Sequence, residues 1–283
     1  MKKTIIAASI AAVVAAPAAF ADLKISGNVY AEYVTTDGAS DLMTNNDLNV
    51  TAKEDLGNGL TATAKLNNAY DDGTQGSGDM SVSLSGDFGA LTLGRIEGFQ
   101  EGKFDAFVNV DAAHDGDIEG QITGGAFARS ERAMYVSPSL NGLQLAVTMQ
   151  DNGDDIDGAS TEVMATYSNA GLKVMAGVSD IDGGDEYENI AVSYKMGDLE
   201  VRAMQRTVDI TTTGDNDTTF LGGKYKMGNN TISFGHLDDD ATGKHNVIGF
   251  AHSLSKKTTV YASFLSADDS ADDNSVIGVS QKF

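Results

Sequence analysis

The sequence contains no cysteine and no tryptophan, and only two prolines among 283 residues. The absence of cysteine excludes a disulfide framework, cysteine-ligated metal sites and catalytic thiols. Basic residues are also scarce, with 19 Lys plus Arg against 41 Asp plus Glu and a formal net charge of −22. A protein that binds nucleic acid needs a cationic face that releases counterions from the phosphate backbone. We therefore expect no nucleic-acid partner.

The first 21 residues have the features of an export signal. Lys2 and Lys3 form a charged start, residues 5–14 are apolar, and residues 19–21 read Ala-Phe-Ala, which is the pattern of a cleavage site. Residues 5–20 contain Pro17 and are fewer than the roughly twenty residues that a membrane-spanning helix needs. The sequence thus predicts a signal peptide at 1–21, cleaved near Ala21/Asp22, and a single domain at 22–283.

The rest of the chain shows the alternation of β-strands. Apolar and polar residues alternate in segments such as 60–66, 80–84 and 143–149, and no apolar run after residue 21 approaches the length of a membrane helix. This alternation predicts an all-β fold. By itself it fits a soluble sandwich with an apolar interior as well as a membrane barrel with an apolar exterior.

The connections between the expected strands separate these two folds. We expect sixteen strands, at 23–35, 47–56, 60–70, 79–86, 91–97, 130–137, 143–150, 160–168, 172–179, 187–196, 199–208, 218–227, 230–238, 245–254, 258–267 and 274–283. Every second connection is short and rich in Gly, Asn or Asp, whereas the others are longer and hold most of the acidic residues. This arrangement is typical of a transmembrane antiparallel β-barrel, whose closed sheet satisfies every backbone group inside the bilayer. A barrel of sixteen strands leaves an aqueous channel.

Four segments resemble the Gram-negative general porin family. They are residues 91–95 (Leu-Thr-Leu-Gly-Arg), 132–143, 253–261 and the C-terminal Phe283, which occur in the order of the family over essentially all of 22–283. The resemblance implies a homotrimer of water-filled barrels in the bacterial outer membrane, through which ions and small hydrophilic solutes diffuse passively. It also implies that the barrel-assembly machinery reads Phe283 as an assembly signal.

The longest connection, residues 97–129, carries the main functional hypothesis. The resemblance implies that this third long loop folds into the barrel and narrows the pore, opposite a cationic wall. The candidate constriction acids are Glu101, Asp105, Asp111, Asp115, Asp117 and Glu119. The candidate wall residues are Lys53, Lys65 and Arg132 by strand parity, Arg95 by motif, and Arg129. An inward position for Arg95 requires a bulge or strand end at Gly94, because strict alternation places Arg95 with Leu91 and Leu93.

The charge balance predicts the selectivity of such a pore. Acids of the loop 97–129 outnumber the candidate bases, and the other long connections add carboxylates at the same end of the barrel. Carboxylates that line a pore favour cations, and their potential extends about 8 Å at physiological ionic strength. We therefore expect a cation preference that weakens at high salt.

Metal and catalytic chemistry have weaker support. Residues 151–158 are rich in Asp but lack the spacing and the bidentate Glu of a calcium-binding EF-hand. The four histidines have no metal-ligand spacing, so we expect no cofactor beyond weakly held divalent cations among the carboxylates of 238–240 and 268–273. No nucleophile elbow, phosphate loop or dinucleotide fingerprint occurs, so we expect no enzyme.

Two other function classes stay open at this point. A secreted or surface calcium-dependent β-rich adhesion protein would account for the Asp and Gly content, but it predicts a soluble chain with repeats of fixed period. An outer-membrane hydrolase predicts a compact group of catalytic residues at the loop end of the barrel.

Overall fold

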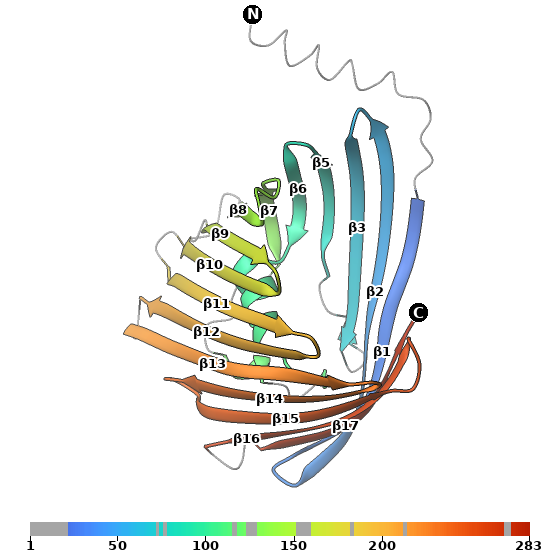
Figure 1. Ribbon diagram of the computed structural model, residues 1–283, viewed down its shortest axis with the longest axis vertical. Coiled ribbons are helices and arrows are strands. Elements are labelled where there is room, and N and C mark those ends of the chain that lie inside the picture. Colours follow the sequence, from blue (N-terminus) through green and yellow to red (C-terminus); the bar gives the residue numbers. More distant parts are fainter. Residues whose placement is uncertain are drawn as a thin grey trace, which may run out of the picture.

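The computed structural model describes residues 22–71, 74–75, 78–114, 118–122, 129–150, 160–181, 184–211, 214–268 and 273–283. The chain forms one antiparallel sheet (Figure 1) of β1 (Asp22–Thr36), β2 (Ala39–Gly57), β3 (Leu60–Asp71), β4 (Thr74–Gln75), β5 (Met80–Gly86), β6 (Gly89–Ile96), β7 (Ser130–Val136), β8 (Leu143–Gln150), β9 (Ser160–Asn169), β10 (Leu172–Ile181), β11 (Glu186–Met196), β12 (Leu199–Ile210), β13 (Gly214–Met227), β14 (Asn230–Asp239), β15 (Gly243–Ser253), β16 (Thr258–Ala267) and β17 (Asn274–Lys282).

Three short helical segments follow β6. They are the π-helix η1 (Gln100–Asp105), the single turn α2 (Ala106–Val108) and the 3₁₀-helix η2 (Glu119–Gln121). The connection 97–129 therefore contains ordered helical turns. Over the described ranges, no helix is long and apolar enough to cross a membrane.

The sheet closes on itself to form a barrel. Strands adjacent in the chain pair in antiparallel fashion, except that the two-residue β4 pairs with the end of β3, and β3 continues the barrel by pairing with β5. Nine residue pairs, from Asn28↔Lys282 to Thr36↔Asn274, join β1 to β17 and so remove the free edges of the sheet. Sixteen strands besides β4 thus form the closed barrel in the described part of the chain, which confirms the predicted fold class.

The outer face of the barrel is apolar, as the alternation predicts. In β11, Ile190 and Val192 are exposed while Asn189 and Ala191, on the opposite face, are buried. The register pairs Val192 with Val174 of β10, so apolar positions of neighbouring strands lie side by side. A closed sheet with an apolar exterior matches the hydrocarbon of a bilayer, in which no water satisfies backbone groups.

The long connections at the loop end are shorter than expected. The expected loop 35–46 is mostly a hairpin, because β1 continues to Thr36 and pairs there with Ala39, the first residue of β2. Asp37 and Gly38 form the turn with φ values of 49° and 74°, a left-handed conformation that Asp tolerates and Gly adopts without steric cost. Several acidic residues that were expected on loops therefore stand at the ends of paired strands.

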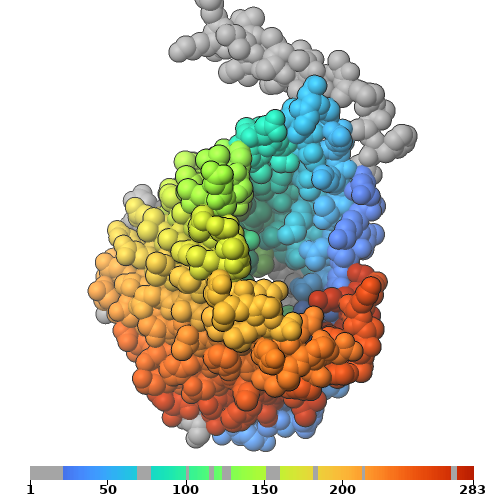
Figure 2. All heavy atoms as spheres, viewed as in Figure 1, coloured from blue at the N-terminus to red at the C-terminus, as the bar shows by residue number. Residues whose placement is uncertain are grey.

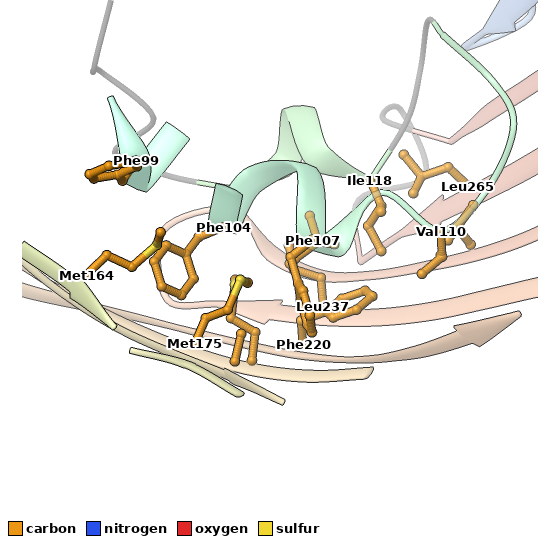
Figure 3. Packing of buried hydrophobic residues seen from close by; sticks show 14 of the residues in the cluster. Phe99, Phe104, Phe107, Val110, Ile118, Met164, Met175, Phe220, Leu237 and Leu265 are labelled. Carbon is orange, nitrogen blue, oxygen red and sulfur yellow. The ribbon is translucent and has the colours of Figure 1, made fainter. Parts of the chain in front are cut away.

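The hydrophobic core lies inside the barrel, between the loop 97–129 and the wall (Figure 3). Six buried side chains of the loop, Phe99, Phe104, Phe107, Val108, Val110 and Ile118, pack against inward residues of β8 to β16, namely Ala146, Met164, Met175, Ala191, Met204, Phe220, Leu237, Val247 and Leu265. Burial of one such large apolar side chain contributes about 1.5–3 kcal/mol. The inner face of the barrel is therefore not uniformly polar, and its apolar part holds the loop in place.

Candidate functional site

The barrel is hollowed between β1–β3 on one side and β7–β10 on the other (Figure 2). A cavity of about 680 Å³, here called the main cavity, lies beside the loop 97–129. One wall is polar, with Lys65, Ser81, Ser83 and Thr92 from β3, β5 and β6. The wall from β7–β10 is mixed, because Met134, Met164 and Met175 lie there with Gln144, Thr166 and Lys173. The loop contributes Glu97, Phe99 and Lys103.

A second cavity of about 400 Å³ lies on the other side of the same loop. The barrel contributes Asn28, Tyr30, Thr259, Ser280 and Lys282 to its lining, and the loop contributes residues that include Asn109, Asp111, His114 and Glu119. The loop 97–129 thus has a cavity on each of two sides, one lined by β3 and β5–β10 and the other by β1, β16 and β17.

Asp105 fixes the first part of this loop to the barrel wall. It forms an ion pair with Arg206 of β12, and the two side chains are only 9% and 1% exposed. Arg206 Nε also donates a hydrogen bond of 2.9 Å to Asn189 Oδ1. Breaking a buried ion pair by removing one partner costs on the order of 3–5 kcal/mol, because the remaining charge is left uncompensated. Asp105 therefore faces the wall and anchors the loop.

Asp111 makes a second anchor further along the loop. Its carboxylate accepts a hydrogen bond from the Ser263 hydroxyl of β16. Burial raises the pKa of Asp111, and the hydrogen bond from Ser263 and the positive charge of Lys224 oppose this shift. Gly249 of β15 allows the close approach, because a Cβ there would lie 2.8 Å from Asp111 Cβ. Asp111 still contributes to the lining of the second cavity.

Of the remaining predicted acids, Glu119 lies at the second cavity. It accepts a hydrogen bond of 3.3 Å from Asn109 Nδ2, and burial raises its pKa. Glu101 belongs to η1, where the structure describes its backbone only. Asp115 and Asp117 fall outside the described residues.

Glu97 is a cavity-lining acid that the sequence analysis did not single out. It lines the main cavity, and Arg129 Nη2 donates to its Oε1 at 3.1 Å. Burial raises the pKa of Glu97, and the positive charge of Arg129 partly opposes the rise. Arg129 also donates from Nε to Asp79 Oδ1 at 2.9 Å, and Lys65 Nζ lies 3.7 Å from Asp79 Oδ2. The structure thus brings Lys65 and Arg129 together with two carboxylates.

Arg132 lies deeper in the wall than a pore-lining residue would. It forms an ion pair with Glu162 of β9, and both side chains are at most 1% exposed. Gly98, at the start of the loop, packs directly on this pair, because a Cβ at Gly98 would overlap the Glu162 carboxylate. Lys53 is exposed on the same inward-facing row as Lys65 but does not line the main cavity.

Arg95 lies on the outward-facing row of β6. It pairs with Met80 of β5 and Glu131 of β7 with no register shift, although Gly94 has a φ of 145°. Arg95 Nε donates to the Arg129 carbonyl at 3.3 Å. The bulge required to turn Arg95 inward is therefore not present at Gly94, and the structure does not bring Arg95 to the cavity.

Arg202 of β12 holds the loop but was not predicted from the sequence. Its Nη1 donates to the carbonyls of Phe107 at 2.9 Å and Asn109 at 3.3 Å, and its guanidinium lies 5.5 Å from the centroid of the Phe107 ring. Glu200 accepts from Arg202 Nε at 2.7 Å. The available signal was the period-2 row of β12, in which Arg202 and Arg206 occupy inward positions four residues apart.

His114 connects the loop to β1 and β2. Its backbone N–H donates to Glu32 Oε1 at 2.8 Å, and the Tyr261 hydroxyl donates to the same oxygen at 2.7 Å. The ring of His114 hydrogen-bonds Asn45 at 3.1 Å and lies 4.6 Å from the Tyr30 ring, measured between centroids. His114, which has no metal-ligand spacing in the sequence, therefore has a structural role.

Metal sites are not evident in the described part of the chain, where no group of three or more His, Asp or Glu side chains could hold an ion. Asp238 pairs with Lys244 at 2.7 Å, and Asp239 accepts hydrogen bonds from Thr218 at 2.6 Å and Asn216 at 3.2 Å. The Asp-rich segment 151–158, which lacks the EF-hand spacing, and residues 269–272 lie outside the described residues.

Comparisons with known proteins agree with this architecture. Residues 7–272 match the Gram-negative porin family. The chain is 25% identical to a monosaccharide porin of a Halomonas species and to the major outer membrane protein of Halomonas elongata, in each case over the full length of both chains.

Solved structures show the same fold. A loop-deletion mutant of the outer membrane protein OmpT of Vibrio cholerae superposes with a TM-score of 0.77 at 15% identity, covering 93% of this chain and 99% of that one. The anion-selective porin of Comamonas acidovorans gives a TM-score of 0.70 at 19% identity, covering 93% and 100%. The family match outweighs the adhesion-protein and hydrolase alternatives, and a channel needs no catalytic residues. This chain belongs to the Gram-negative porin family and is a non-enzymatic channel protein of the outer membrane.

Proposed function

We propose that this porin passes ions and small hydrophilic solutes by passive diffusion, with a preference for cations. The main cavity supports the diffusion part of the proposal. Lys65, Ser81 and Thr92 give it a wettable wall, and the loop 97–129 narrows the barrel without sealing it. A hydrated solute can exchange water for these hydroxyl and amino groups as it passes.

One observation carries the cation preference: carboxylates crowd the hairpin ends at the loop end of the barrel. They include Asp37, Asp41, Asp185, Glu186, Asp209, Asp215, Asp217, Asp238, Asp240, Asp268 and Asp273. Lys244 lies among them and pairs with Asp238. Such an anionic mouth raises the local concentration of cations over roughly a Debye length.

At the constriction, Glu97 and Glu119 are the acids that we assign to the pore. The carboxylate of Asp105 instead pairs with Arg206 of the wall, and that of Asp111 accepts a hydrogen bond from Ser263. Glu101, Asp115 and Asp117 remain proposed constriction acids on the basis of the family resemblance. Lys65, Arg129 and Lys53 are the proposed opposing bases, of which Lys65 lines the main cavity.

Biogenesis and assembly complete the proposal. We infer export with cleavage near Ala21/Asp22, insertion in the bilayer as a homotrimer, and recognition of Phe283 by the barrel-assembly machinery. Phe283 N–H donates to the Gly27 carbonyl at 3.1 Å, and the Phe283 ring covers Gly27, so that a Cβ there would overlap the ring. The C-terminal residue thereby fastens β17 to β1 at the seam of the barrel.

Liposome swelling tests the diffusion channel. Purified protein in liposomes should admit sugars at rates that fall steeply with molecular size, and monosaccharides are the first choice because of the Halomonas relative's name. Stepwise single-channel currents in planar bilayers should accompany the swelling. Protein that is folded in detergent but gives neither sugar uptake nor current would refute the proposal.

A further inference from the structure

Basic side chains gather inside the barrel at the end opposite the acidic mouth. Near the short turns, the inward-facing rows carry Lys24, Lys53, Lys173, Lys195, Lys224, Lys226 and Lys282. The turn between β15 and β16 adds Lys256 and Lys257. At this end the acids Asp22 and Glu200 share the inward rows with these lysines, so the positive charge is in excess there but not unopposed.

Four of these lysines line one cavity of about 420 Å³, here called the turn cavity. Lys226 of β13, Lys256 and Lys257 of the β15–β16 turn, and Lys282 of β17 share it with residues that include Ser253, Ser255 and Thr259. No acidic side chain is among the described residues that line it. The described lysines that form ion pairs are Lys65 and Lys244, so these four amino groups have no carboxylate partner within that part of the chain.

The turn cavity opens to the aqueous interior. Lys226 is register-paired with Thr231 of β14, and Thr259 is paired with Ser280 of β17, on rows that continue into the buried inward residues Ser233 and Ser263. Side chains on these rows point away from the bilayer. A ligand of this cavity must therefore be soluble rather than a lipid headgroup.

The backbone of the β15–β16 turn is held in place. Ser255 Oγ accepts hydrogen bonds from the N–H groups of Lys257 at 3.1 Å and Thr258 at 3.0 Å. The N–H of Lys282 donates to the Lys257 carbonyl at 2.8 Å, which ties β17 to the same turn. The turn that carries Lys256 and Lys257 is thus fixed beside Lys282.

We propose that the turn cavity binds a small multivalent anion of the oligophosphate class. Four ammonium groups around one cavity repel one another, and a multivalent anion relieves that repulsion at several groups at once. Lysine suits this role because it is a compact charge that contacts phosphate oxygens without requiring a bidentate geometry. The hydroxyls of Ser253 and Thr259 supply further donors at the same cavity.

The position of the site connects it to the channel. Thr259 and Lys282 line both the turn cavity and the second cavity, which reaches Asp111 and Glu119 of the loop. An anion in the turn cavity therefore stands in the path from the second cavity to the turn end. We expect it to reduce conductance when added from that end; this effect rests on the proposed channel, whereas binding itself does not.

Calorimetric titration of the detergent-folded protein with inorganic tripolyphosphate tests the site. K226Q/K282Q removes two inward lysines of the turn cavity, and K24Q/K195Q removes two inward lysines of the same end that do not line it. At about fivefold per lysine, K226Q/K282Q should bind roughly 20-fold more weakly, and K24Q/K195Q within about threefold of the parent chain. Absence of saturable binding, or equal weakening by both pairs, would overturn the proposal.

Current measurements separate this proposal from the channel function. Asp37→Cys, in a chain without native cysteine, lets an impermeant thiol reagent identify the loop side in a planar bilayer. Tripolyphosphate should reduce the current from the turn side only, and less in K226Q/K282Q. Channels that conduct normally but neither bind nor respond to tripolyphosphate would refute the anion site alone. Saturable binding without any channel current would refute the proposed function and leave the site standing.

Discussion

Asp105 of the loop 97–129 and Arg206 of β12 form a buried ion pair that ties this loop to the barrel wall. The family resemblance and its place in the loop predicted Asp105 to be an acid of the pore, but its carboxylate instead pairs with Arg206 of the wall. The loop is thus positioned by charge pairing as well as by its apolar face, and mutations that leave the pore surface unchanged should still alter the pore.

Asp105→Ala should destabilise the barrel and loosen the loop. Arg206 is 1% exposed, so loss of its partner leaves a buried charge at a cost of about 3–5 kcal/mol. Thermal unfolding monitored by circular dichroism should show the loss, and single-channel currents should become noisier. D105L/R206M removes both charges and should recover a large part of the stability. Equal destabilisation by the single and double changes would contradict the anchoring role.

Phe104→Ala should also destabilise the barrel and loosen the loop, in this case by removing apolar packing. Phe104 is fully buried between the loop and the wall, and truncation of such a phenylalanine costs about 3–5 kcal/mol. We expect the freed loop to raise both the mean conductance and its fluctuation. Phe88→Ala is the matched control, because Phe88 lies in the short turn between β5 and β6 and is 42% exposed. A variant with normal stability and normal current would show that the apolar face does not hold the loop.

Glu97 and Lys65 should shift ion selectivity in opposite directions. A unit charge about 8 Å from an ion in water contributes ~0.5 kcal/mol, with opposite sign for a cation and an anion, so their permeability ratio changes roughly fivefold. Glu97→Gln should lower the potassium-to-chloride permeability ratio by that factor, and Lys65→Gln should raise it. Glu131→Gln is the control, since Glu131 is an exposed acid paired with Arg95 on the outward row. Shifts of the same sign from Glu97 and Lys65 would exclude their assignment to the pore.

The cation preference should fall as the pH is lowered, before exposed carboxylates titrate. Burial raises the pKa of Glu97 and of Glu119, so both side chains take up protons at a higher pH than an exposed glutamate. Protonation removes negative charge from the pore and therefore reduces its attraction for cations. Reversal potentials measured from neutral to mildly acidic pH check this, and E97Q/E119Q should flatten the curve. An unchanged curve in that double variant would assign the titration to other groups.

Phe283 offers a test of the assembly signal. Phe283→Ala should lower the amount of heat-modifiable barrel in the outer membrane of an expressing cell. Gly27→Val leaves the terminal aromatic in the sequence but displaces its ring, because the ring covers Gly27. If the machinery reads the terminal residue itself, Gly27→Val should assemble better than Phe283→Ala. The reverse order would favour seam packing over recognition.

The strands and the closed barrel could be predicted because each rests on local information. Alternation places Ile190 outward and Asn189 inward whatever the partners are, and the short turns reveal which strand ends meet. Lys65 was assigned correctly to the inward row for the same reason. Arg95 was misplaced by motif where parity alone would have set it on the outward row.

The site was less predictable because its contacts join distant parts of the chain. Asp105 and Arg206 are 101 positions apart, and His114 and Glu32 are 82 apart. Alternation indicates that a row faces inward, but not whether water or the loop covers it. Phe220 and Met204, which the loop covers, therefore could not be distinguished from residues that line the water-filled pore. Only the path of the loop across the barrel decides which acids face the pore.

The reversal potential of the unmodified protein in a planar bilayer, under a potassium chloride gradient, tests the central claim most directly. We predict a potential of the sign that potassium permeation produces, with a magnitude that decreases when the mean salt concentration is raised. A potential of the opposite sign, which denotes preferred chloride permeation, would contradict it.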